Sequence, residues 1–145
     1  MKRLFAMSML TLMVLIPFQV NAKNDLIIVP DYYVEPVQML TTAYLDAGKT
    51  ASGEYTRPGI CAGKREWIGK TAILYERNPD NTIGDMLGIF EVLDTGFGAD
   101  SDGNGVGSIE EGKVIDVWFG TYEECKDWMR KTNGKCYMQL FDAAG

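Results

Sequence analysis

Runs of apolar, β-branched and aromatic residues recur along the chain, and each is bounded by glycine, proline, asparagine or aspartate. Short runs of this composition favour β-strands over helices. The predicted strands lie at 37–45, 71–75, 86–93, 114–119 and 135–141, and a shorter apolar run at 26–29 stops at Pro30. The intervening segments are rich in turn-forming residues and are predicted to be loops or turns, at 46–59, 78–81 and 96–107.

One segment, 121–132, is predicted to be a helix. Thr121 and Glu124 form a capping box at its start, and the Asn133-Gly134 pair is a stop signal at its end. Many short strands with a single helix are typical of a small β-barrel. We therefore predict a mainly β fold with one helix near the C-terminus, and we expect Trp67 and Trp128 to pack in its core.

The first 22 residues have the three-part layout of a secretory signal peptide. Lys2 and Arg3 precede an apolar stretch at 4–16, and Val20 and Ala22 are suitable residues before a cut after Ala22. The alternative is an uncleaved anchor, although the apolar stretch is short for a membrane span. The prediction is a signal peptide at 1–22, a lead-in at 23–36 and one domain at 37–145. We expect the mature protein to lie outside the cytoplasm, with no membrane attachment.

The chain contains no histidine, which excludes the Ser-His-Asp triad, the Cys-His dyad and zinc sites built on histidine. Catalysis would therefore fall to carboxylates, tyrosine, lysine, cysteine or a metal held by oxygen atoms. The 20 acidic residues outnumber the 14 basic ones, and the net charge of −6 argues against a nucleic-acid partner. The hydrophobic content of 46% is sufficient for the packed core of one domain.

Three cysteines, Cys61, Cys125 and Cys136, remain after the predicted cleavage. Export permits disulfides, and a bridge between Cys125 and Cys136 could span the helix end and the last strand. The alternative is three buried thiols. A catalytic cysteine is not expected, because no histidine is present to activate it.

Asp116 is a charged residue inside an otherwise apolar predicted strand, where its desolvation is costly unless it is paired or has a function. Because side chains alternate along a strand, Ile115, Val117 and Phe119 form one apolar face, and Asp116 shares the opposite face with Trp118. A partly desolvated aspartate has a raised pKa that suits general-acid catalysis. The alternative is a structural aspartate that hydrogen-bonds the backbone of a loop.

Several short motifs occur in a defined order between residues 37 and 143: Thr41-Thr42-Ala43-Tyr44, Thr50-Ala51-Ser52-Gly53, Gly59-Ile60-Cys61-Ala62, Ile68-Gly69-Lys70-Thr71-Ala72, Asp94-Thr95-Gly96 and Val114-Ile115-Asp116-Val117-Trp118-Phe119. This order resembles the 3D (three-aspartate) domain, which is similar to the catalytic barrel of membrane-bound lytic transglycosylase A. The resemblance implies a six-stranded double-psi β-barrel that cleaves the glycan strands of peptidoglycan.

The same resemblance implies roles for individual residues. Asp116 falls on the catalytic acid/base of the family, and Asp94 falls on an aspartate that lines the same site. Apart from these two carry-overs, the predicted substrate contacts are Tyr44, Thr95, Gly96 and Trp118. The aromatic rings of Tyr44 and Trp118 could stack on sugar rings, and the alternative is that they pack in the core. The family chemistry implies no cofactor and no metal.

Two features depart from the family pattern. The stretch 62–65 lacks the family's upstream aspartate, and Glu66 is the nearest acid. The loop after Asp94 is longer than usual, and four of its residues have the spacing of an EF-hand calcium loop, namely Asp100, Asp102, Asn104 and Glu111. Because Gly107 occupies a position that is usually apolar and no helix precedes the loop, a flexible acidic loop is the preferred interpretation.

The main functional hypothesis is a secreted or cell-wall-associated lytic transglycosylase whose partner is the glycan strand of peptidoglycan. Asp116 would protonate the oxygen of the MurNAc–GlcNAc bond and then accept the C6 hydroxyl proton, which closes a 1,6-anhydro ring without any histidine. One alternative is a non-catalytic barrel that binds glycan. Another is a hydrolase that uses Asp94 and Asp116 as a pair.

Overall fold

The structure is a computed structural model that describes residues 34–143. These residues form, in order, β1 (Val37–Tyr44), β2 (Ile60–Ala62), the 3₁₀ helix η1 (Arg65–Trp67), β3 (Thr71–Arg77), β4 (Ile83–Asp94), β5 (Val114–Trp118), α1 (Tyr122–Thr132) and β6 (Lys135–Phe141). The predicted signal peptide at 1–22 and the apolar run at 26–29 lie outside the described residues. Within the described range, no helix has the length and apolar character needed to span a membrane.

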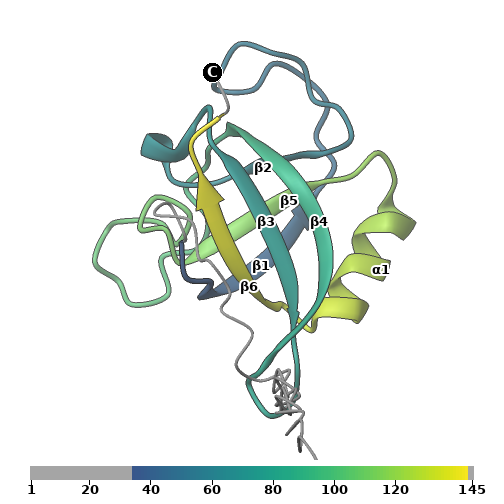
Figure 1. Cartoon of the computed structure of the whole chain (residues 1–145). Coiled ribbons are helices and arrows are strands. Elements are labelled where there is room, and N and C mark those ends of the chain that lie inside the picture. Colours follow the sequence, from purple (N-terminus) through teal and green to yellow (C-terminus); the bar gives the residue numbers. More distant parts are fainter. Residues whose placement is uncertain (1–33, 144–145) are drawn as a thin grey trace, which may run out of the picture. The chain divides into compact units, whose positions relative to one another are not determined.

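The six strands pair in one closed ring, in the order β1-β5-β2-β4-β3-β6, with β6 pairing again with β1 (Figure 1). The β1–β5 and β2–β4 pairs are parallel, and the other four pairs are antiparallel. The prediction of a mainly β fold with one helix is confirmed. Because the ring closes on itself, each strand has two neighbours and satisfies its backbone groups on both sides.

Five strands coincide with the predicted runs, although β3 and β4 extend beyond their apolar stretches. The sixth strand, β2, lies in a segment that the sequence assigned to no element. All three of its residues are buried, so it lacks the alternation of polar and apolar positions that reveals a strand. It pairs with β4 on one side and with β5 on the other, and it therefore joins the two strands that carry the candidate aspartates.

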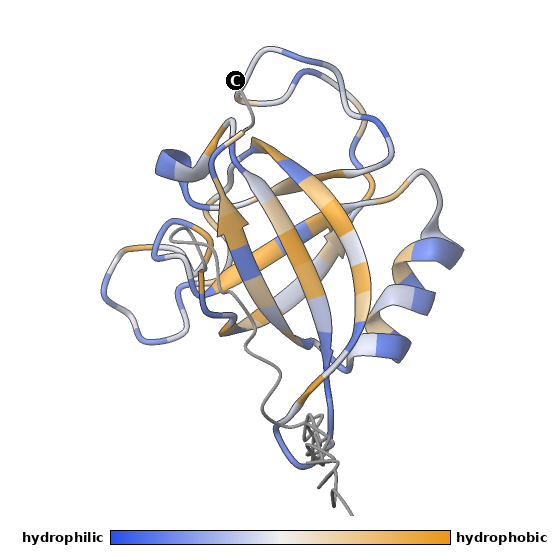
Figure 2. Cartoon of the chain, in the orientation of Figure 1, coloured by the Kyte–Doolittle hydropathy of each residue, from blue (hydrophilic) through white to orange (hydrophobic). Residues whose placement is uncertain are grey.

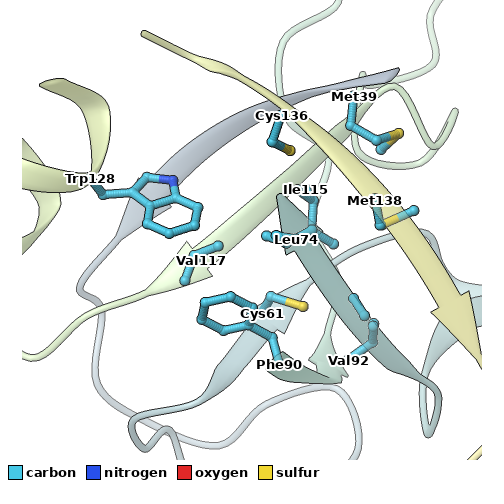
Figure 3. Close-up of a cluster of buried hydrophobic side chains, with 11 residues drawn as sticks. Met39, Cys61, Leu74, Phe90, Val92, Ile115, Val117, Trp128, Cys136 and Met138 are labelled. Atoms are coloured by element: carbon cyan, nitrogen blue, oxygen red, sulfur yellow. The ribbon is translucent and has the colours of Figure 1, made fainter. Parts of the chain in front are cut away.

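The hydrophobic core fills the interior of the ring, where inward-facing side chains from all six strands meet (Figure 3). Leu74, Val92, Ile115 and Val117 are fully buried, and burial of one such side chain stabilises the fold by about 1.5–3 kcal/mol. Trp67 of η1 packs against this cluster, as predicted. Figure 2 shows apolar and polar positions following one another along the strands, as expected when only one side of each strand faces the core.

The α1 helix lies beside the ring (Figure 1) and ends at the predicted residue, and it begins one residue later than predicted, with Thr121 as its N-cap. Thr121 caps its start by accepting a hydrogen bond of 3.3 Å from the Glu124 backbone N–H, and Asn133 ends it in the left-handed conformation with φ 48°. The helix buries Trp128, whose indole N–H donates to the Thr41 hydroxyl at 3.0 Å. The predicted placement of Trp128 in the core is confirmed.

All three cysteines are buried free thiols. Cys61 and Cys136 lie in the core of the ring (Figure 3), whereas Cys125 lies on α1. The bridge considered between Cys125 and Cys136 is therefore not formed, and the alternative of three thiols holds. Burial raises the pKa of Cys136 to about 12 and also raises the pKa of Cys61 and Cys125, so none of them is an activated nucleophile.

Candidate active site

The two predicted catalytic residues, Asp94 and Asp116, are brought together on either side of β2. Asp94 is the last residue of β4, Asp116 lies in the middle of β5, and Ala62 is the register partner of both. Both aspartates line an open pocket of about 240 Å³, which we call the aspartate pocket. Its other lining residues are Tyr44, Asp46, Ala47, Gly48, Lys49, Thr56, Ala62, Thr95, Gly96 and Ile109.

Asp116 is half-buried and lies on the wall of the aspartate pocket. Its strand neighbours Ile115 and Val117 are fully buried in the core, which confirms the predicted alternation of the two faces. The Thr42 hydroxyl donates a hydrogen bond of 2.7 Å to one carboxylate oxygen, Oδ1. Desolvation raises the Asp116 pKa, and the nearby charge of Asp94 raises it further, while the Thr42 hydrogen bond lowers it. A raised pKa is the direction that favours a proton-donating group.

Asp94 has both carboxylate oxygens occupied. Oδ1 accepts hydrogen bonds from the backbone N–H groups of Ala51 at 3.0 Å and Thr95 at 2.9 Å, and Oδ2 accepts one of 3.2 Å from the Tyr44 hydroxyl. These donors come from three separate segments of the chain. Asp94 therefore holds the 46–59 loop, Tyr44 and the start of the next loop in place around Asp116.

The predicted substrate contacts divide into two groups. Tyr44, Thr95 and Gly96 line the aspartate pocket, where a bound molecule would meet them. Burial and the adjacent Asp94 carboxylate raise the Tyr44 pKa, so this phenol stays protonated and acts as a hydrogen-bond donor. Trp118 is not among the lining residues, and its indole N–H donates to the Asp46 backbone carbonyl at 3.0 Å. In this structure Trp118 fixes the start of the 46–59 loop.

The aspartate pocket contains a further acid that sequence reasoning missed, Asp46. It follows directly after the predicted strand at 37–45, in a loop that was assigned no function. Glu66, the nearest acid to the missing family aspartate, lies outside the pocket with a side chain 71% exposed and pairs with Lys64 at 2.8 Å. A larger hollow of about 680 Å³ beside Arg57 contains neither Asp94 nor Asp116, and its charged groups pair with one another.

The acidic loop after Asp94 is held together by its own hydrogen bonds. Asp100 accepts hydrogen bonds from backbone N–H groups, and the Asn104 amide donates to Glu111 at 2.7 Å. The Lys113 ammonium contacts Asp102 at 3.0 Å and Glu111 at 2.6 Å, so a side-chain cation already neutralises these carboxylates. Across residues 34–143, no group of three or more cysteine, aspartate or glutamate side chains is arranged to hold a metal ion.

The geometry of the aspartate pocket supports proton transfer. A half-buried carboxyl with a raised pKa faces an open pocket, and a phenol donor and backbone groups surround it. A scan against models of protein families, a search of curated proteins and a search of solved structures each found no match to this chain.

Proposed function

We propose that the protein is a secreted lytic transglycosylase that cleaves peptidoglycan glycan strands, with Asp116 as its acid/base. The observation that supports this proposal most directly is the setting of Asp116 on the pocket wall. Thr42 occupies one oxygen of its carboxyl group, and no hydrogen bond from the described residues reaches the other oxygen, Oδ2. That oxygen is available to exchange a proton with a bound sugar.

In the proposed reaction, Asp116 is protonated when the substrate binds. It donates its proton to the oxygen of the MurNAc–GlcNAc bond, and the GlcNAc fragment leaves as an alcohol. The N-acetyl oxygen of the MurNAc residue stabilises the cation that forms. The Asp116 carboxylate then takes the proton of the C6 hydroxyl, whose oxygen closes the 1,6-anhydro ring. One proton leaves the enzyme and one returns, so no water and no second nucleophile are consumed.

The other pocket residues have supporting roles in this proposal. Asp94 positions Tyr44 and the 46–59 loop through its three hydrogen bonds. Tyr44, Thr95 and Gly96 form the wall that contacts the sugar. The ring also supports a double-psi β-barrel as the underlying fold, because its two parallel pairs, β1–β5 and β2–β4, lie next to each other in the ring and are joined by the antiparallel pair β2–β5.

Muropeptide mass spectrometry tests this function. Purified protein incubated with peptidoglycan should release 1,6-anhydro-muropeptides, and Asp116→Asn should lower the rate by about 100-fold or more. Asp85→Asn is the matched control, because Asp85 is an exposed aspartate of β4 outside the pocket, and it should keep the wild-type rate. Anhydro products made equally fast by Asp116→Asn would contradict the assignment, and products with reducing ends would show a hydrolase instead.

A second candidate function is a non-catalytic module that binds glycan. The observation that favours it is Ala62, which occupies the position between Asp94 and Asp116 and contributes no carboxylate. Sedimentation with peptidoglycan and release of no product would support this candidate.

A further inference from the structure

Three strands, β2, β4 and β5, meet at the aspartate pocket, and two of them contribute a carboxylate to it. β4 contributes Asp94 and β5 contributes Asp116, but the residue of β2 that pairs with both is Ala62. The third carboxylate on the pocket wall belongs to Asp46, which comes from the loop after β1. Three aspartates therefore line the pocket, and the third comes from a loop and not from β2.

Asp46 is held in place by the strands that carry the other site residues. Its backbone carbonyl accepts the hydrogen bond of the Trp118 indole at 3.0 Å. Trp118 lies on β5 two residues after Asp116, and its register partner on β1 is Tyr44. This contact ties the backbone of Asp46 to β5, the strand that carries Asp116.

The Asp46 carboxylate differs from that of Asp94 in its partners. Asp94 accepts three hydrogen bonds that offset its charge, whereas no hydrogen bond or ion pair to the Asp46 carboxylate occurs among residues 34–143. Its charge is therefore not neutralised by a close partner. The side chain is exposed, so its effect on Asp116 acts through solvent and is screened by salt.

We propose that Asp46 is the third carboxylate of this site, a positioning residue whose negative charge holds the proton on Asp116 before the substrate binds. This inference rests on the proposed function, in which Asp116 must be protonated to act. A like charge close to a carboxyl group favours the neutral form, and the charge of Asp46 does raise the Asp116 pKa. Asp46 itself exchanges no proton with the sugar.

Other ionisable groups also face Asp116, and each comes from a different part of the fold. They are Tyr44 of β1, Lys49 of the 46–59 loop, Cys61 of β2, Asp94 of β4 and Cys125 of α1. The phenol and the two thiols have raised pKa values and are neutral near pH 7. Lys49 carries the opposite charge, and its ammonium lies over the Tyr55 ring, 5.9 Å from the ring centroid. Removal of the Asp46 charge should therefore shift the balance towards the ionised form of Asp116.

The decisive experiment titrates the Asp116 carboxyl group by carbon NMR in the full chain, with the resonance assigned from Asp116→Asn. In Asp46→Asn the titration midpoint should move to lower pH, and Asp46→Glu should restore it because the charge returns. The difference should be largest at 0.01 M salt, where the screening length is about 30 Å, and should shrink at 1 M salt, where it is about 3 Å. An unchanged midpoint in Asp46→Asn at low salt would overturn the proposal.

A pH–rate profile of anhydro-muropeptide release gives a second readout. Asp46→Asn should lower kcat by roughly two- to tenfold at pH 7 and leave it unchanged at acidic pH, where Asp116 is protonated in both proteins. A loss that is equal at every pH would contradict the proposed role. If the wild-type protein releases no product while the NMR midpoint still moves, the Asp46–Asp116 coupling stands and the proposed function fails. If product forms and the midpoint does not move, only the role of Asp46 fails.

Discussion

Thr42 and Asp116 face each other across the parallel pair β1–β5, and the Thr42 hydroxyl donates a hydrogen bond of 2.7 Å to the Asp116 carboxylate. This bond favours the charged form of Asp116 and lowers its pKa, whereas desolvation and the charges of Asp94 and Asp46 raise it. Desolvation is the largest contribution, so the net pKa is raised. The Asp116 pKa thus depends on one residue that lowers it and two that raise it, and each of these residues can be replaced separately.

Thr42→Val should raise the Asp116 pKa further, because it removes the hydrogen bond that favours the carboxylate. The expected shift is opposite in sign to that of Asp46→Asn, and carbon NMR titration of the Asp116 carboxyl measures both. Thr42→Ser keeps the hydroxyl and should titrate like the wild type. A midpoint that falls in Thr42→Val would show that the hydroxyl does not stabilise the charged form.

The parts of this fold that could be predicted are those with a local signal. The alternation of apolar and polar residues around Asp116 predicted both the strand and the face on which the carboxyl group lies. Thr121 and Asn133 predicted the two ends of α1. Three buried residues are too few to show any period, so β2 was not predicted. Asp46 was missed for a different reason. It is an exposed acid in a turn-rich loop, and only the pairing of β1 with β5 brings it to the pocket.

Asp116→Asn should gain stability relative to the wild type as the pH rises towards neutrality. An aspartate whose pKa is higher in the folded chain contributes stability that is fully present below its unfolded pKa of about 3.9 and is lost as the pH rises through its folded pKa. Asparagine does not ionise and avoids this loss. The free energy of unfolding of Asp116→Asn, relative to the wild type, should therefore increase between about pH 3 and pH 7.

Urea unfolding at several pH values measures this difference, with Asp85→Asn as the control for a change of charge at an exposed site. The slope with pH is the diagnostic quantity, since the substitution also changes local packing by an amount that is the same at every pH. A difference that stays constant or decreases with rising pH would contradict a raised pKa for Asp116 in the folded protein.

Trp118→Phe should loosen the start of the 46–59 loop while leaving the ring intact. Phenylalanine retains the aromatic surface but lacks the indole N–H that donates to the Asp46 carbonyl. Amide hydrogen exchange should be faster in the loop and unchanged in β3 and β6, and stability should fall by about 1 kcal/mol. If Trp118 instead serves only to stack on sugar, Trp118→Phe would weaken glycan binding without any change in loop exchange.

All three cysteines should be measured as thiols. The intact mass of the unreduced protein should correspond to three free SH groups, and alkylation in denaturant should add three labels. In the native protein the reaction should be slow, because burial raises the pKa of Cys61 and Cys136 and keeps the thiolates unpopulated. A mass two hydrogens lighter, restored by a reductant, would show a disulfide in place of these thiols.

Trp128→Phe should destabilise the protein by about 1–3 kcal/mol, because the buried indole N–H donates to Thr41 and joins α1 to β1. The phenyl ring keeps the edge contact with Phe90 but leaves the Thr41 hydroxyl without this donor. Tyr122→Phe is the matched control on the same helix, since Tyr122 is 65% exposed and its replacement should change stability by less than about 0.5 kcal/mol. Equal urea midpoints for the two variants would show that the Trp128–Thr41 bond contributes nothing to the attachment of the helix.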